Sequence, residues 1–164
     1  MPLTRTVNRG LSLAALCLGV VLLGIGVPGG VSAAAGEVRV LSVDGIINPI
    51  SARYLVRGID EAADEGDAAV LIELDTPGGL LDATQEITGA MLNARLPVIV
   101  YVTPAGTHAA SAGTFITMAA HVAAMAPSTR IGAATPVSGE GQEIPDDLRT
   151  KIINDTAVYA RSIA

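Results

Sequence analysis

Three short apolar runs alternate along the chain with segments of helical periodicity, and this alternation restricts the fold more than any other feature. The runs are VRVLSV (38–43), AAVLIEL (68–74) and PVIVYVT (97–103). Strands separated by helices pair in parallel, so the pattern predicts an α/β fold with a mostly parallel sheet. The third run is continuous and β-branched, which predicts a strand covered on both faces.

The segments between these runs have apolar residues at helical spacing. Helices are expected at about 49–65, 81–93, 111–120 and from Pro145 towards Ala164. A fourth strand is expected at 121–125. In such folds ligands bind beyond the carboxyl ends of the strands, which here are the loops 76–79 and 103–110.

The inner faces of the first two helices follow from the same spacing. In the first helix the residues expected to face the sheet are Ile50, Tyr54, Leu55, Ile59 and Ala62. In the second they are Leu81, Ile87, Met91 and Leu92.

Residues 1–35 have the three parts of a secretory signal. Arg5 and Arg9 precede an apolar run at 11–27, and small residues follow at 31–35. We expect an apolar signal helix, with cleavage near Ala33 or Ala35; an uncleaved signal anchor is the alternative. Residues 36–164 then form one domain on the extracytoplasmic side, and because they stop inside a helical pattern we expect this domain to be truncated.

Charge and composition exclude several classes of function. The 164 residues have a net charge of −6 and only four aromatic residues, which argues against nucleic-acid binding. Cys17 is the only cysteine, so no disulfide framework is possible. His108 and His121 lack the helical spacing of a metal pair, and we expect neither a metal nor a cofactor.

Two small-residue segments could form a reactive site. Asp75-Thr76-Pro77-Gly78-Gly79 follows a strand, and its N–H groups could hold an anion; an ordinary tight turn is the alternative. Ser111, within Ala109-Ala110-Ser111-Ala112-Gly113-Thr114, lies where a loop enters a helix. It is either a helix N-cap or a nucleophile, with the Ala112 amide directed at the oxyanion.

Lys151 is the only lysine of the chain and lies in the last expected helix. A lysine acts as a base only where burial favours its neutral form. As a base, Lys151 would lie buried and uncharged beside the Ser111 hydroxyl, with the neighbouring carboxylates pointing away; a solvated surface charge is the alternative. We expect His108 to contact substrate at the rim of the site rather than to act as the base.

The pattern resembles the ClpP-class serine peptidases, and more closely their membrane-associated NfeD-type branch, the stomatin-operon partner proteases. The stretches that carry the resemblance are VLSVDGIINPISARYLVRGIDEA (40–62), LIELDTPGGLLDATQEI (71–87), ASAGTFITMAAHVAAMAPSTRIGAATPV (110–137) and KIINDTAVYARSIA (151–164). The resemblance implies a ClpP/crotonase-like fold of repeated β-β-α units.

It also implies roles for individual residues. Ser111 is the nucleophile and Lys151 the base of a Ser-Lys dyad, while Gly79 and Ala112 donate to the oxyanion. Gly78 and His108 are expected to contact substrate. The segment 134–136 has no histidine where ClpP has its base, which favours the lysine dyad, and His108 itself departs from the family pattern.

The resulting hypothesis is a serine endopeptidase that cuts apolar segments of membrane-associated proteins, with a stomatin-like protein as one candidate substrate. Membrane association of the full-length protein and homo-oligomerisation are expected from the resemblance. Two alternatives remain: a crotonase-like acyl-CoA enzyme, and a catalytically inactive scaffold of the same fold that organises a membrane partner.

Overall fold

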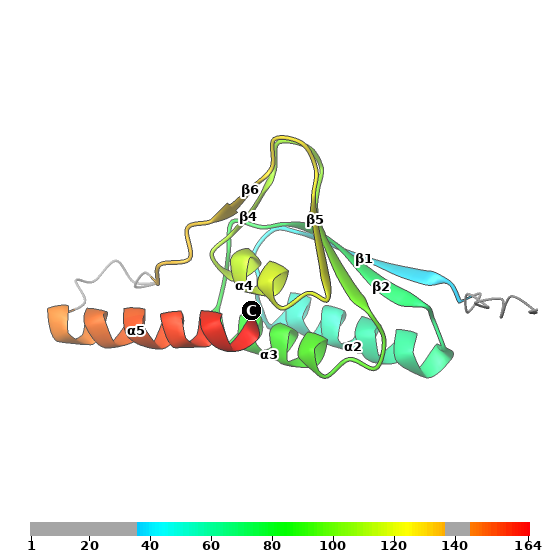
Figure 1. Ribbon diagram of the computed structural model, residues 1–164, viewed down its shortest axis with the longest axis horizontal. Coiled ribbons are helices and arrows are strands. Elements are labelled where there is room, and N and C mark those ends of the chain that lie inside the picture. The colour runs from blue at the N-terminus through cyan, green and yellow to red at the C-terminus, as the bar shows by residue number, and fades with distance from the viewer. Residues whose placement is uncertain (1–35, 137–144) are drawn as a thin grey trace, which may run out of the picture. The chain divides into compact units, whose positions relative to one another are not determined.

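A four-stranded parallel sheet is the centre of the computed structural model, which describes residues 36–136 and 145–164 (Figure 1). Its strands lie in the order β1 (Val38–Asp44), β2 (Ala69–Asp75), β3 (Val98–Val102) and β5 (Val122–Met125). All three neighbouring pairs are parallel, so the predicted parallel α/β sheet is confirmed. The expected signal segment, 1–35, lies outside the described residues.

In the described ranges four helices accompany the strands: α2 (Pro49–Glu65), α3 (Leu81–Leu92), α4 (Ala112–Met118) and α5 (Asp146–Ile163). Local sequence explains the limits of α2. The Asn48 side chain accepts hydrogen bonds from the N–H groups of Ile50 and Ser51, and Gly66 ends the helix in the left-handed conformation. Of the helices in the described ranges, none combines the length and apolar character needed to cross a bilayer.

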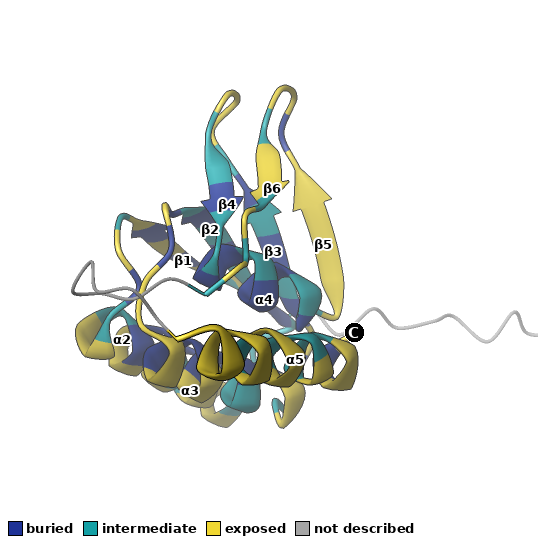
Figure 2. Ribbon diagram, turned by 90° about the vertical axis from the view of Figure 1, so that its left-hand side faces the viewer, coloured by how far each residue is buried: buried dark blue, intermediate teal, exposed yellow. Residues whose placement is uncertain are grey.

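The helices cover only one face of the sheet. Val70, Ile72 and Leu74 of β2 alternate with half-buried residues, and in β3 the half-buried residues are Ile99 and Tyr101. The prediction that β3 is covered on both faces is therefore wrong. The reason is that α2, α3 and α4 all return to the same side of the sheet, while β5 is exposed along its whole length (Figure 2).

A second, smaller layer of strand pairing lies beyond the carboxyl ends of the main strands. Here β4 (His108–Ala110) pairs in parallel with β6 (Arg130–Gly132), and single bridges join Ile47 to Gly79 and Thr76 to Ala109. Each main strand is thus followed by a short paired segment and then by a helix. This β-β-α order occurs four times among residues 36–136 and 145–164, and the sequence did not predict β4 or β6.

Candidate functional site

Ser111 is held in a conformation that residues with a side chain rarely adopt. It joins β4 to α4 with φ 50° and ψ −112°. Its N–H donates to the Gly132 carbonyl at 2.8 Å, and its carbonyl accepts from the Thr114 N–H at 2.9 Å. Ser111 occupies the N-cap position of α4, as one interpretation predicted, but its side chain makes no capping hydrogen bond. Sharp strand-to-helix turns of this kind present a serine hydroxyl outward.

The Thr76–Gly79 turn packs directly against Ser111. Gly78 has φ 123°, and a Cβ atom built on it would lie 2.7 Å from the Ser111 Cβ. Thr76 fixes the turn, because its N–H donates to the His108 carbonyl at 2.9 Å and its Oγ1 accepts from the Gly78 N–H at 3.0 Å. Only a glycine at position 78 permits this approach.

Two main-chain N–H groups belong to the segments that adjoin the serine, the glycine turn and the first turn of α4. Ile47 bonds to the Gly78 carbonyl and the Leu80 N–H, so strand alternation directs the Gly79 N–H to the opposite side, where β4 lies. The Ala112 N–H belongs to the first turn of α4. Within residues 36–136 and 145–164 neither group donates a hydrogen bond. Free donors beside a hydroxyl can stabilise negative charge that develops on a bound carbonyl.

His108 lies in β4, three residues before Ser111. Its N–H donates to Asp75 Oδ1 at 3.3 Å, and its Nδ1 lies 3.8 Å from the same oxygen. The imidazole is partly exposed and borders a cleft of about 350 Å³. The residues that line this cleft are His108, Ala110, Arg130, Ile131, Gly132 and Ala133.

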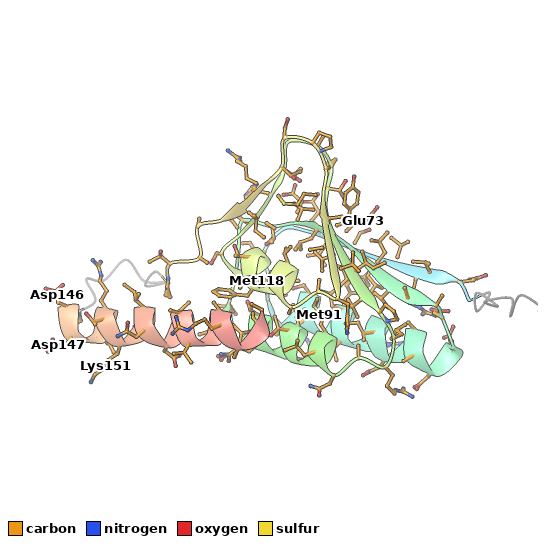
Figure 3. The ribbon with its side chains drawn as sticks, viewed as in Figure 1. Glu73, Met91, Met118, Asp146, Asp147 and Lys151 are labelled. Atoms are coloured by element: carbon orange, nitrogen blue, oxygen red, sulfur yellow. The ribbon has the colours of Figure 1, made fainter. Side chains whose placement is uncertain are left out.

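Lys151 is not brought to Ser111 in this structure. The residue is exposed near the start of α5, at the same end as Asp146 and Asp147, and points away from the sheet (Figure 3). The opposite end of α5 makes the contacts: the Tyr159 hydroxyl lies 2.6 Å from Thr88 Oγ1, and the Tyr159 ring packs on Phe115. Because α5 is held through that end, the expected buried amine beside Ser111 is not observed.

Two threonines that support the site were not predicted from the sequence. Thr114 Oγ1 donates to the Gly132 carbonyl at 2.9 Å and accepts from the Gly132 N–H at 3.1 Å, which fastens β6 to the start of α4. Thr76 holds the glycine turn in a similar way, because its Oγ1 accepts a hydrogen bond from the Gly78 N–H. Both threonines lie inside the two small-residue segments, so their nearness in sequence to Gly78 and Ser111 is the feature that could have predicted their supporting role.

His121 has a structural role. Its Nδ1 accepts a hydrogen bond from the Val98 N–H at 3.1 Å, which joins the start of β5 to β3. In the described part of the chain no group of three or more His, Cys, Asp or Glu side chains is placed to hold a metal ion.

Known proteins resemble the part of the chain that contains this site. Residues 37–156 match the family model described as NfeD1b, N-terminal domain. The chain is 40% identical over 132 residues to the membrane-bound protease PH1510 of Pyrococcus horikoshii, and this match covers 77% of the chain but only 29% of the relative.

Solved structures of a protease named 1510-N, membrane-bound and stomatin-specific, share the fold. A variant with a lysine replaced by alanine, in complex with a substrate peptide, gives a TM-score of 0.72 at 39% identity, covering 80% of this chain and 60% of that one. A variant with a serine replaced by alanine gives a TM-score of 0.71 at 39% identity, covering 79% and 63%. The chain belongs to the NfeD1b N-terminal domain family.

Proposed function

We propose that this chain is the peptidase portion of a membrane-bound serine protease, with Ser111 as its nucleophile. The observation that carries the proposal is the strained turn at Ser111, whose side chain is pressed against Gly78 and bordered by the Gly79 and Ala112 N–H groups. Backbone strain persists where the surrounding structure enforces it, and it clusters at active sites. The four β-β-α units also support a ClpP/crotonase-type fold.

The reaction follows from these positions. Ser111 Oγ attacks a peptide carbonyl carbon, and its proton passes to Lys151 Nζ. The Gly79 and Ala112 amides donate to the oxyanion, and each such donor lowers the barrier by about 3–4 kcal/mol. Lys151 then gives the proton to the leaving amine, and water hydrolyses the acyl-enzyme.

The role of Lys151 rests on the resemblance and on spacing along the chain. The serine and lysine replaced in the solved relative are 41 positions apart, while Ser111 and Lys151 are 40 apart. For the dyad to form, α5 must shift or a second copy must supply the lysine, because Lys151 lies eight residues, or about 12 Å of helix, from the Tyr159 anchor.

Membrane association and a stomatin-like substrate are carried over from the relatives, while export is inferred from the sequence of residues 1–35 and the remaining properties from the family resemblance. We propose that the enzyme cuts apolar segments of membrane-associated proteins, with a stomatin-like protein as one substrate. We also propose that it acts at the extracytoplasmic face after export by the 1–35 signal, and that it works as a homo-oligomer.

A fluorophosphonate probe tests the nucleophile. The wild-type chain should be labelled and Ser111→Ala should not. Ser128→Ala is a matched control, because Ser128 also has a positive φ of 62° but lies in the 126–129 turn between β5 and β6. Labelling that persists in Ser111→Ala and disappears in Ser128→Ala would contradict the assignment.

The exposed position of Lys151 favours one second candidate, a catalytically inactive scaffold of the same fold. Cleavage of an apolar peptide by wild type, lost in Lys151→Ala and not restored by Lys151→Arg, supports the dyad. Probe labelling and peptide cleavage both absent, with the fold intact by circular dichroism, supports the scaffold.

A further inference from the structure

The cleft beside Ser111 carries two basic side chains on one face of the β4–β6 pair. His108 and Arg130 are direct partners in the parallel register, as are Ala110 and Gly132. Paired residues of neighbouring strands project to the same face, and all four line the same cleft. The two basic groups are therefore neighbours on one small surface.

Within the described residues, Arg130 has no carboxylate beside it on this surface. The lining of the cleft contains no carboxylate. Arg130 is exposed and has no ion-pair partner within the described ranges, in contrast to Arg39, Arg57 and Arg95. Asp75 approaches His108 Nδ1 but lines a different cleft, with Thr103 and Pro104. The cleft thus presents one arginine charge and an imidazole on a chain whose net charge is −6.

The position of this pair relative to the serine is fixed by the strands. Gly132, two residues after Arg130, accepts the hydrogen bond from the Ser111 N–H. At roughly 3.3 Å per residue, His108 and Arg130 lie about 7–10 Å along the strands from the serine. An extended peptide with its scissile bond at Ser111 would place its second or third residue from that bond at the basic pair.

We infer that His108 and Arg130 form a specificity subsite for an acidic side chain, Asp or Glu, two or three residues from the scissile bond. The inference rests on the proposed protease function, and names the class of peptide that the site prefers. The remaining lining, Ala110, Ile131 and Ala133, is small or apolar, so an acidic residue within an otherwise apolar segment fits the cleft.

Matched peptides test the subsite. Each is an apolar sequence, acetylated and amidated, with Glu, Gln or Lys placed at the second or third position on either side of the cleaved bond. At low ionic strength kcat/KM should be about fivefold higher for Glu than for Gln at one of these positions, lowest for Lys, and the preference should shrink with added salt. A Gln peptide shortened to end in a free carboxylate at that position shows whether a chain terminus is recognised instead.

Substitutions of His108 and Arg130 test whether these two residues cause the preference for Glu. Arg130→Gln and His108→Gln should each reduce the Glu-to-Gln ratio towards one, whereas Arg53→Gln, which removes an exposed charge from α2, should leave the ratio unchanged. Equal kcat/KM for the Glu and Gln peptides, or an unchanged ratio in Arg130→Gln, overturns the subsite.

Binding separates this inference from the proposed function. Fluorescence anisotropy in the Ser111→Ala background should show the same preference for Glu without any cleavage. Glu-selective binding that needs Arg130, combined with no turnover by wild type, rejects the protease and retains the subsite. Turnover by wild type without charge preference retains the protease and rejects the subsite.

Discussion

The two residues proposed to share one reaction lie in parts of the molecule that differ in packing. Ser111 follows β4 and precedes α4, in which Ala112, Gly113, Phe115, Ile116 and Thr117 are buried. Lys151 lies on α5, an 18-residue helix whose only buried residue is Ile163. An unfilled groove of about 270 Å³ remains between α4, the 134–136 segment and α5.

This difference in packing implies that the Ser111 turn is preorganised, whereas α5 can shift more easily. The serine, the glycine turn and the two N–H groups are fixed by main-chain hydrogen bonds to the core. Helix α5 has few buried contacts, which is the usual property of elements that open or shift at low cost. The proposed site thus joins a serine and a glycine turn that are firmly held to a lysine on a helix with little buried surface.

The largest expected effect on stability is at a buried residue of the sheet, compared with an exposed residue of α5. Ile72→Ala should lower the free energy of unfolding by about 2–5 kcal/mol, because Ile72 is fully buried between β1 and β3. The matched change Ile153→Ala on α5, where the side chain is 42% exposed, should cost less than about 1 kcal/mol. Urea unfolding measures both, and equal costs would show that α5 is packed as tightly as the sheet.

Gly78→Ala should have the next largest effect. The new methyl group meets the Ser111 Cβ at 2.7 Å in a left-handed conformation, so we expect a loss of about 1–3 kcal/mol together with loss of probe labelling. Gly89→Ala in α3 is the control, because a Cβ there has open space and should stabilise the helix by up to about 1 kcal/mol. Full labelling of Gly78→Ala would show that the turn and the serine are less tightly coupled than described.

Thr76→Val probes the support of the glycine turn. The buried hydroxyl is replaced by a methyl group of similar size, which leaves the Gly78 N–H without its acceptor and should cost about 1–3 kcal/mol. Thr150→Val removes a hydroxyl that bonds the Asp146 carbonyl on exposed α5, and should change stability by less than about 0.5 kcal/mol. Thermal and urea unfolding of the pair give the comparison.

The smallest effect is expected at Lys151. Because its side chain is exposed, Lys151→Ala should leave the free energy of unfolding within about 0.5 kcal/mol of wild type, even if activity is lost. If Lys151→Ala lowered the free energy of unfolding by more than about 1 kcal/mol, the Lys151 side chain would be packed against the rest of the domain in solution, contrary to its position in Figure 3.

The main sheet and its helices could be predicted because each has its own periodicity. The helix expected at 49–65 is observed at the same limits, since Asn48, Pro49 and Gly66 mark its ends. Its inner face was predicted only in part: Leu55, Ile59 and Ala62 are buried, but Ile50 is 72% exposed. Likewise Leu81 and Leu92 of α3 are about half exposed, while Thr84 and Thr88 are buried. Spacing identifies a helix, whereas the neighbours decide how wide its buried stripe is.

The second layer could not be predicted from local pattern. β4 and β6 have three residues each, too few for a period to appear, and they exist because residues 22 positions apart along the chain pair with each other. The strain at Ser111 depends on this pairing, through the hydrogen bond to Gly132. The sequence therefore indicated the serine and the glycine turn, but not the geometry that joins them.

The four-fold repetition of the β-β-α unit has a consequence for how such turns arise. Ala133 follows β6 as Ser111 follows β4, and its φ of 54° is close to the 50° of Ser111. A positive φ thus follows both short strands, once at a residue with a hydroxyl group and once at a residue with only a methyl group. In a scaffold of this kind a reactive group can be gained or lost by one Ser–Ala exchange, because the turn already holds its residue at a positive φ.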